Sequence, residues 1–516
     1  MKLRLNRKLI ILTLAICAMA VAVSAMRRQA TDEFSSFWGS LYTYTAQDAA
    51  ATEREDGSFE IQNQKKVSRN MLLRWNKIAI DASGLDHTPV APGENRVFGE
   101  QLGPCRAARA EAIVHIAMFE ALNAINGSYQ SYVGLYPAVK KTAAEAAIAQ
   151  AAHDALVGVF PSQKSRFDVF LQADLGGVPV GKPRTNGIAL GRAAAFAILA
   201  LTDHDGSQFV EQKINVDYIP SNDPGVWRQD PISQLPPALG SKWGAVTPLV
   251  MQSGSQFRTP AFPALGSAAY ATAYNEVKRL GGDGVITPTE RTAAQTQIGL
   301  YWAYDGTPTL CAPPRLYNQI TVHIADQMGT NDIDLARLLA LVNTAMSDAG
   351  IAIWESKYFY KIWRPVGGVR EADPGTGPTG IGDNNAATTC DPTFTPLGAP
   401  ASNLAGPNFT PPFPAYPSGH AGFGGALFET LRKFYGTDNI AFTFVSDEFN
   451  GATRDNKGNI RPLLPRSFTT LSQAEEENGQ SRIYLGIHWS FDKTEGIAQG
   501  RKVADWVFSH AFQPAN

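Results

Sequence analysis

Two cationic side chains, Lys357 and Arg364, lie close together in the segment Trp354–Pro365. Their separation of seven residues is nearly two helical turns. The spacing therefore predicts that both lie on one helical face and that Pro365 ends the helix just after Arg364. Two cations directed at one point suit a multiply charged oxyanion, but a solvated basic face explains them equally well. Lys361 lies on a similar face, so spacing alone does not exclude it.

A second segment, Pro411–His420, joins a proline-rich lead-in to the start of a predicted helix over Gly419 to Tyr435. The free N–H groups and positive dipole end of a helix N-terminus form a natural anion site. Ser418 is a good N-cap and adds a hydroxyl, Gly419 lets the backbone approach closely, and His420 can transfer a proton from the first turn. For this segment alone, a capped helix with a structural histidine is the simpler interpretation.

The third segment, Ser481–Asp492, contains a cation and a histidine next to a carboxylate. Arg482 is rigid and carries several donors. His488 is predicted to open the last helix, with Asp492 four residues later on the same face. A carboxylate beside a histidine fixes its tautomer and makes the other ring nitrogen a better ligand or nucleophile. A histidine packed in the core is the competing interpretation.

The three segments together are far more specific than any one of them. Lys-x6-Arg-Pro, Pro-Ser-Gly-His and Ser-Arg-x5-His-x3-Asp occur in this order over residues 357–492. The set resembles the superfamily of vanadium haloperoxidases and type 2 phosphatidic-acid or bacterial acid phosphatases. Further stretches are most similar to the fungal vanadium chloroperoxidases: Trp302–Gly306, Pro314–Gln319 and Phe413–His420. The resemblance implies a vanadium-dependent haloperoxidase that uses vanadate and hydrogen peroxide to oxidise a halide, chloride or bromide, to hypohalous acid.

The resemblance also implies a role for each matching residue. His488 would bond directly to vanadium, and the vanadate oxygens would be neutralised by five further residues: Lys357, Arg364, Ser418, Gly419 and Arg482. The catalytic residues would be His420 as the acid–base group, His488, Lys357 as an electrophilic stabiliser, and Asp305 as the partner of Arg482. Trp354 and Phe413 would shape the halide site, and Asp492 would support the site from behind its ligands.

Two other functions fit parts of the same pattern. Phosphate and vanadate share shape and charge, so a phosphatase would use His488 as the nucleophile of a phosphohistidine intermediate. A protein that binds an oxyanion without turnover is the other alternative, although the complete set of acid–base and ligand residues argues against it. Phe413, where algal bromoperoxidases tend to carry histidine, and the short Lys-to-Arg spacing follow the chloroperoxidase pattern and favour chloride.

Helical periodicity dominates the elements that must position these residues. Helices are predicted over Arg106–Asn126, Lys140–Phe160, Ile188–Thr202, Ser267–Leu280, Pro288–Tyr304, Arg315–Met328, Asp332–Trp363, Gly419–Tyr435 and His488–Phe512. Strand alternation is scarce, and residues 203–265 and 371–417 are rich in proline and glycine. We expect an all-α protein, a large helical-bundle domain of two packed four-helix bundles with long irregular loops. The predicted organisation is a signal peptide over 1–25, a lead-in segment over 26–85, and a helical domain over 86–516 with its active site within 300–500.

Composition sets the outer limits of these interpretations. The net charge is -2, with 44% hydrophobic and 18% charged residues, which is typical of a globular protein and gives no indication of nucleic-acid binding. A basic start, an apolar run from Leu9 to Val23 and the small residues at its end predict a secreted or periplasmic protein, associated with a membrane only if the signal is not cleaved. Outside the predicted signal peptide, one disulfide and one free thiol are possible among three cysteines, and the pairing stays open: Cys105, Cys311 and Cys390. Oligomeric state is not predicted.

Overall fold

The computed structural model describes residues 33–44 and 67–515, and the predicted signal peptide, residues 1–25, lies outside the described residues. Helices dominate this part of the chain, which confirms the predicted all-α class. The described strands form two short antiparallel pairs. β1 (Gln212–Lys213) pairs with β2 (Pro237–Ala238), and β3 (Phe442–Phe444) pairs with β4 (Arg466–Phe468).

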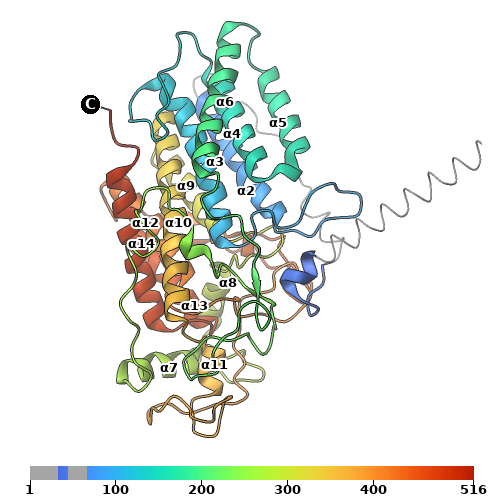
Figure 1. Ribbon diagram of the computed structural model, residues 1–516, viewed down its shortest axis with the longest axis vertical. Coiled ribbons are helices and arrows are strands. Elements are labelled where there is room, and N and C mark those ends of the chain that lie inside the picture. The colour runs from blue at the N-terminus through green and yellow to red at the C-terminus, as the bar shows by residue number, and fades with distance from the viewer. Residues whose placement is uncertain (1–32, 45–66, 516) are drawn as a thin grey trace, which may run out of the picture.

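The helices form two groups that pack side by side (Figure 1). The first group is α2 (Val67–Asp86), α3 (Pro104–Asn126), α4 (Ala144–Val159), α5 (Lys164–Gly176) and α6 (Lys182–Thr202). The second is α9 (Pro313–Gln327), α10 (Asp332–Tyr360), α12 (Gly419–Tyr435), α13 (Leu471–Tyr484) and α14 (Ser490–His510). Further helices of the described residues lie outside these groups, among them α7 (Ala268–Leu280), α8 (Ala293–Tyr301) and α11 (Pro365–Arg370). Short 3-10 turns are Pro161–Gln163, Trp243–Ala245 and Asp447–Phe449.

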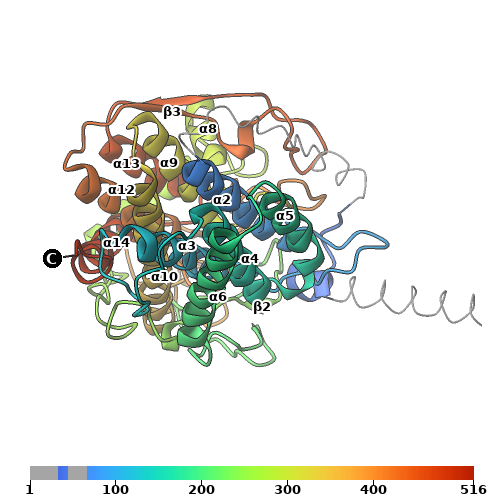
Figure 2. The same ribbon diagram turned by 90° about the horizontal axis from the view of Figure 1, so that it is seen from above.

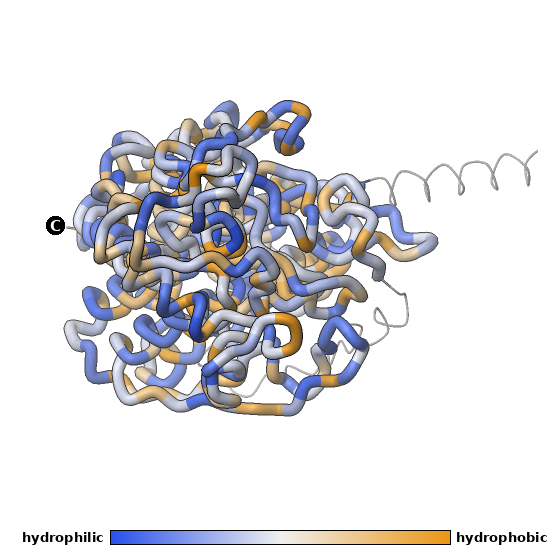
Figure 3. Tube along the Cα trace, turned by 90° about the horizontal axis from the view of Figure 1, so that it is seen from below, coloured by the Kyte–Doolittle hydropathy of each residue, from blue (hydrophilic) through white to orange (hydrophobic). Residues whose placement is uncertain are grey.

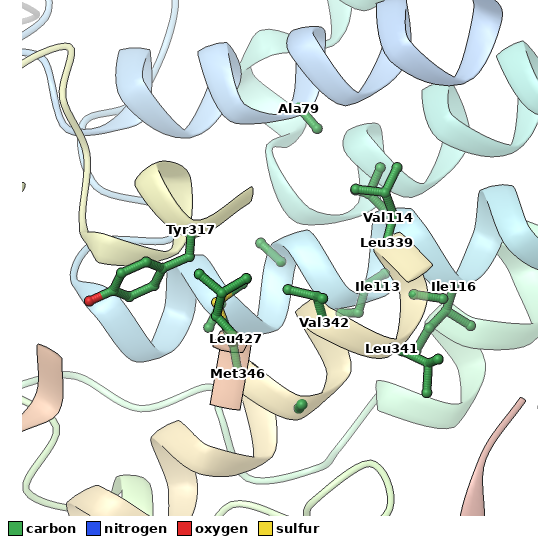
Figure 4. Close-up of a cluster of buried hydrophobic side chains, with 14 of the residues drawn as sticks. Ala79, Ile113, Val114, Ile116, Tyr317, Leu339, Leu341, Val342, Met346 and Leu427 are labelled. Atoms are coloured by element: carbon green, nitrogen blue, oxygen red, sulfur yellow. The ribbon is translucent and has the colours of Figure 1, made fainter. Parts of the chain in front are cut away.

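The two groups meet where α3 packs against α10 (Figure 2). Almost every residue of α10 from Leu335 to Lys357 is buried, because apolar side chains occur on every side of the helix and it packs against helices of both groups. Figure 4 shows this core, with side chains contributed by five helices: Ala79, Ile113, Val114, Ile116, Tyr317, Leu339, Leu341, Val342, Met346 and Leu427. By length and composition α6 and α10 could cross a membrane, but the apolar window of α10 is entirely buried. Seen from below, hydrophilic residues are spread over the loops of the molecule (Figure 3).

Helices α12 and α14 approach each other unusually closely, and this contact positions the site. A Cβ atom on Gly500 would lie 2.0 Å from the carbonyl oxygen of Gly422, so neither backbone leaves room for a side chain there. At one end of the contact, the backbone N–H of Ser418 donates to the carbonyl oxygen of Asp492 at 3.0 Å. The start of α12 is therefore held directly against the first turn of α14.

The helix predictions fail where tertiary contacts decide the structure. The lead-in predicted over 26–85 contains α2, whose Leu72 and Trp75 are buried in the main core. Helices α5 and α13 were not predicted. The sequence of α13 is mostly polar and is stabilised from outside, since its Glu475 accepts from Arg432 and Arg501 of neighbouring helices.

Candidate active site

The three chemical segments meet in one buried place. Lys357 lies in the last turn of α10, Ser418 caps α12, and Arg482 lies in the last turn of α13. His488 lies just before Trp489, the N-cap of α14. All four side chains are buried, although the segments are far apart in the sequence.

Arg364 reaches the site by a different route from the one predicted. Helix α10 ends at Tyr360, because Lys361 adopts a left-handed backbone conformation with φ of 55°. Arg364 is then the N-cap of α11, and Pro365 begins that helix instead of ending the previous one. The prediction that both cations lie on one helical face is therefore wrong. Lys361 is exposed, which removes it from the site.

The guanidinium of Arg364 is held by three acceptors and keeps one side unpaired. Its Nε donates to the carbonyl oxygen of Phe413 at 2.9 Å, and Nη1 donates at 2.9 Å both to the carbonyl oxygen of Ile487 and to Nε2 of His488. Nη2 is buried and has no hydrogen-bond partner in the protein. Because an unpaired buried donor is costly, this group indicates a place for an anion.

The hydrogen bonds of His488 define its tautomer. Nδ1 lies 2.8 Å from Oδ2 of Asp492 and donates to it, while Nε2 accepts from Arg364. Burial and the neighbouring charges of Arg364 and Lys357 lower the pKa of His488 well below its usual value, so the ring is neutral. Burial raises the pKa of Asp492 to about 7, against the opposing effect of Lys357. A neutral imidazole with an unprotonated Nε2 is the form that ligates a metal.

Arg482 provides the other unpaired donors. Its Nη2 donates to Oδ1 of Asp305 at 2.6 Å, so the expected pair of Arg482 and Asp305 is present and both side chains are buried. Burial raises the pKa of Asp305, and the charge of Arg482 opposes that rise. Nε and Nη1 of Arg482 are buried without a partner in the protein.

His420 lies in the first turn of α12, as predicted, and lines a cavity with Arg482 and His488. Its Nε2 donates to the carbonyl oxygen of Ala303 at 2.5 Å and lies 4.0 Å from Oδ1 of Asp305. Burial and the charge of Arg482 lower the pKa of His420 well below its usual value. The ring is therefore neutral, and since Nε2 carries the proton, Nδ1 is the nitrogen that can accept another.

The contacts of Lys357 differ from those expected of a residue that bonds to vanadate, the role that the resemblance implied. Its Nζ donates to the carbonyl oxygens of Pro414, Ala415 and Pro417 at 2.8, 2.8 and 2.5 Å, which uses all three N–H groups of an ammonium. Burial and the charge of Arg364 lower its pKa, but three carbonyl acceptors require the protonated form. In this arrangement Lys357 supplies positive charge, and no N–H remains to hold a ligand.

The two aromatic residues that are predicted to shape the halide site, Trp354 and Phe413, lie next to each other. The centroids of Trp354 and Phe413 are 4.8 Å apart, and Nε1 of Trp354 donates to the carbonyl oxygen of Leu239 at 3.0 Å. Both rings line the cavity beside Gly419, where an added Cβ would lie 3.5 Å from the indole of Trp354. The positive Nζ of Lys357 lies 5.1 Å from the centroid of the Phe413 ring.

Sequence reasoning missed part of the cavity wall. Phe37 and Trp38 line the same cavity, although they precede the range of 300–500 in which the site was expected. The carbonyl oxygen of Ala303, which accepts from His420, was also missed, because any residue type provides a backbone carbonyl. The one available signal was the density of aromatic residues between Phe34 and Tyr44.

The unpaired donors fit a tetrahedral oxyanion bonded to a histidine. Arg364 and Arg482 together present three buried N–H-bearing nitrogens without protein partners. Arg364 contacts the unprotonated Nε2 of His488, and Arg482 lines the same cavity as His488. A bound anion with several oxygens would satisfy these donors and compensate the crowded positive charge. The residues present therefore fit vanadate, which accepts hydrogen bonds through its oxygens and a nitrogen ligand through its metal.

The chain is similar to known proteins in both sequence and fold. Residues 337–516 match the family model described as the second helical-bundle domain of VCPO. The chain is 31% identical to the vanadium chloroperoxidase of Curvularia inaequalis, with 84% of this chain and 80% of that protein covered. The fold is similar to that of a bacterial vanadium-dependent iodoperoxidase, with a TM-score of 0.65, 22% identity, and 86% and 97% of the two chains covered. It is also similar to a holo-type bacterial vanadium-dependent chloroperoxidase, with a TM-score of 0.55, 16% identity, and 81% and 94% covered.

Together with this 31% identity, the helical fold and the buried, cation-rich site define the class of vanadium-dependent haloperoxidases. Within that class, the chain belongs to the vanadium chloroperoxidase family. It is an enzyme with a vanadate cofactor that oxidises halide with hydrogen peroxide, as the sequence motifs predicted.

Proposed function

We propose that this haloperoxidase accepts chloride as well as bromide and releases hypohalous acid, with His488 as the vanadium ligand and His420 as the acid–base group. The observation that carries the assignment of residues is the set of unpaired guanidinium donors on Arg364 and Arg482 beside Nε2 of His488. Bound vanadate supplies a Lewis-acid centre that activates peroxide without a change in its oxidation state. The protein supplies the binding site, the protons and the halide wall.

Two kinds of group would bind the vanadate anion: donors that form hydrogen bonds to its oxygens, and positive charges that attract it without a hydrogen bond. The two arginines donate to oxygens, and the N-terminus of α12, with Ser418 and Gly419, adds the positive end of a helix dipole. Lys357 holds its charge within the carbonyl cage formed by residues 414–417 and so strengthens the field without making a directed bond to the anion. Asp492 fixes the proton of His488 on Nδ1, which keeps Nε2 unprotonated, as a metal ligand requires.

His420 is the residue that transfers protons. Because burial keeps its ring neutral, Nδ1 can accept a proton from incoming hydrogen peroxide and later return it as the hypohalous acid leaves. The bond from Nε2 to the carbonyl oxygen of Ala303 holds the ring in one orientation throughout. Asp305 fixes Arg482 beside this ring through their ion pair.

The halide reacts against a wall of aromatic rings. Trp354 and Phe413 present apolar rings, and the ammonium of Lys357 near the Phe413 ring favours an anion at that wall. A phenylalanine at position 413 adds no titratable group, so a small halide is bound by charge and by loss of water. These features support chloride as a substrate.

We also propose that the protein is exported, on the basis of the basic and apolar pattern of residues 1–25. Expression of the full chain followed by fractionation and N-terminal sequencing tests this proposal. A mature protein that begins near residue 26 outside the cytoplasm supports export, and a cytoplasmic protein that begins at Met1 refutes it.

Halide-resolved kinetics test the enzymatic proposal. Vanadate-free protein is titrated with vanadate, and oxidation of chloride, bromide and iodide by hydrogen peroxide is measured beside hydrolysis of a phosphate ester. We expect vanadate-dependent turnover with chloride and bromide. Turnover with iodide alone would refute the proposal that chloride and bromide are substrates. Hydrolysis of the ester without oxidation of any halide would show that the protein is a phosphatase.

A further inference from the structure

A described N-terminal segment, residues 33–44, forms part of the wall of the active-site cavity. The backbones of Thr43 and Ala405 exchange two hydrogen bonds of 2.9 and 3.0 Å, which hold the segment against the loop before the helix α12. The ring of Trp38 packs edge-on against Phe409, with centroids 5.2 Å apart. Trp38 is only 1% exposed whereas Phe37 is partly exposed, so the segment extends from the surface to the cavity.

The cavity that these residues enclose is small and apolar. Its free volume is about 40 Å³, room for roughly three water-sized molecules. Apart from the site residues, its lining includes Trp38, Leu235, Leu239, Phe409 and Pro411. An oxyanion bonded to His488 would take up most of this space. A substituted aromatic molecule therefore does not fit beside it.

We propose that Phe37 and Trp38 are specificity-determining residues that restrict the site to small peroxides, so that organic molecules meet the oxidised halogen only outside the cavity. This inference rests on the proposed halide oxidation and adds the size class of the oxidant. Neither residue contacts the predicted vanadate ligands through a hydrogen bond of its side chain. Their role is to fill space in the cavity and so to exclude bulky molecules from it.

The experiment compares hydrogen peroxide with cumene hydroperoxide as the oxidant of bromide. With an alkyl hydroperoxide, bromide loses two electrons to the O–O bond. One oxygen then leaves in hypobromous acid and the other leaves as the alcohol after uptake of one proton. The quantity measured is the ratio of kcat/KM for the bulky peroxide to kcat/KM for hydrogen peroxide. We expect a low ratio in the wild type and an increase on the order of tenfold or more in Trp38→Ala.

Trp38→Phe is the matched control. Nε1 of Trp38 has no hydrogen-bond partner in the protein, so phenylalanine removes no bond and retains an aromatic wall. We expect its ratio to stay near that of the wild type. Phe37→Ala is the second test variant, because Phe37 is partly exposed and its replacement disturbs the core less than that of Trp38. We expect it to raise the ratio in the same direction by a smaller factor.

A binding measurement makes the inference independent of turnover. Calorimetric titration of vanadate-free protein with cumyl alcohol should detect binding to Trp38→Ala and none to the wild type, since an enlarged apolar cavity takes up an aromatic ligand. Equal binding to both proteins, or an unchanged peroxide ratio in folded Trp38→Ala and Phe37→Ala, overturns the inference. If the wild type does not oxidise halide with hydrogen peroxide, the proposed function is refuted instead. The titration with cumyl alcohol would still show whether Trp38 limits the size of molecules that enter the cavity.

Discussion

Replacing Arg364 with lysine separates the charge of the active site from its directed hydrogen bonds. The substitution keeps one positive charge but removes the buried Nη2 donor that has no protein partner. A hydrogen bond to a charged group contributes about 1.5–3 kcal/mol, which corresponds to a loss of roughly 10- to 100-fold in vanadate affinity. The carbonyl oxygens of Phe413 and Ile487 also lose their fixed donors, so we expect lower stability, by about 1–3 kcal/mol for each acceptor left unpaired.

Lys361→Met provides the matched control, because Lys361 is a cation only three positions away that is exposed to solvent. Removing an exposed charge should change vanadate affinity by less than about twofold, since solvent and salt screen it. Calorimetric titration of vanadate-free protein gives the dissociation constants, and recovery of halide oxidation during the same titration gives an independent value. Equal weakening by both substitutions, or unchanged affinity in Arg364→Lys, would refute the proposed role of the unpaired guanidinium donor.

Three further predictions follow from other contacts. His420→Ala should lower turnover by about 10²- to 10⁴-fold while calorimetry still detects vanadate binding; unchanged turnover would remove this residue from proton transfer. Gly500→Ala should lower the free energy of unfolding by about 1–3 kcal/mol, because its Cβ would lie 2.0 Å from a backbone oxygen of α12. Gly176→Ala, where an added Cβ meets nothing within 4 Å, should not lower it in the same thermal unfolding experiment, and equal effects would contradict the packing argument. Burial lowers the pKa of His153 and the hydrogen bond to Asp154 raises it, with a net rise above 6.5. Its contribution to stability is therefore present below pH 6.5 and is lost as the pH rises through the folded-state pKa, so denaturant titration should find His153→Gln more destabilising at pH 5 than at pH 8. A larger destabilisation by His153→Gln at pH 8 than at pH 5 would contradict this prediction.

Local sequence patterns predicted the helix that carries His420 without error at either end. Ser418 is the N-cap of α12, as predicted, and Gly436, the residue after the predicted end, is its left-handed C-cap. Both signals act within one turn of the helix end, so they need no tertiary partner. The set of cations and histidines was also readable, because an oxyanion requires those residue types wherever the chain brings them together.

Folding decided how those residues are used. A left-handed turn at Lys361 ends α10 early and sends Arg364 into the site from α11, which residue spacing could not show. The ammonium of Lys357 is enclosed by carbonyl oxygens from a segment more than fifty residues later in the chain. Backbone carbonyls have no sequence signature, so neither this cage nor the contact of His420 with Ala303 was predictable.

The amino-acid sequence by itself determined the chemistry of this protein: an oxyanion site with a histidine ligand, built on helices whose ends are specified by neighbouring residues. The tertiary structure alone decided which donors remain unpaired and how much space surrounds them. The physical reason is that hydrogen-bond saturation and cavity size depend on contacts between segments distant in sequence, such as Trp38 with Phe409 and Arg364 with His488. Periodicity and spacing describe only what lies within a few residues along the chain.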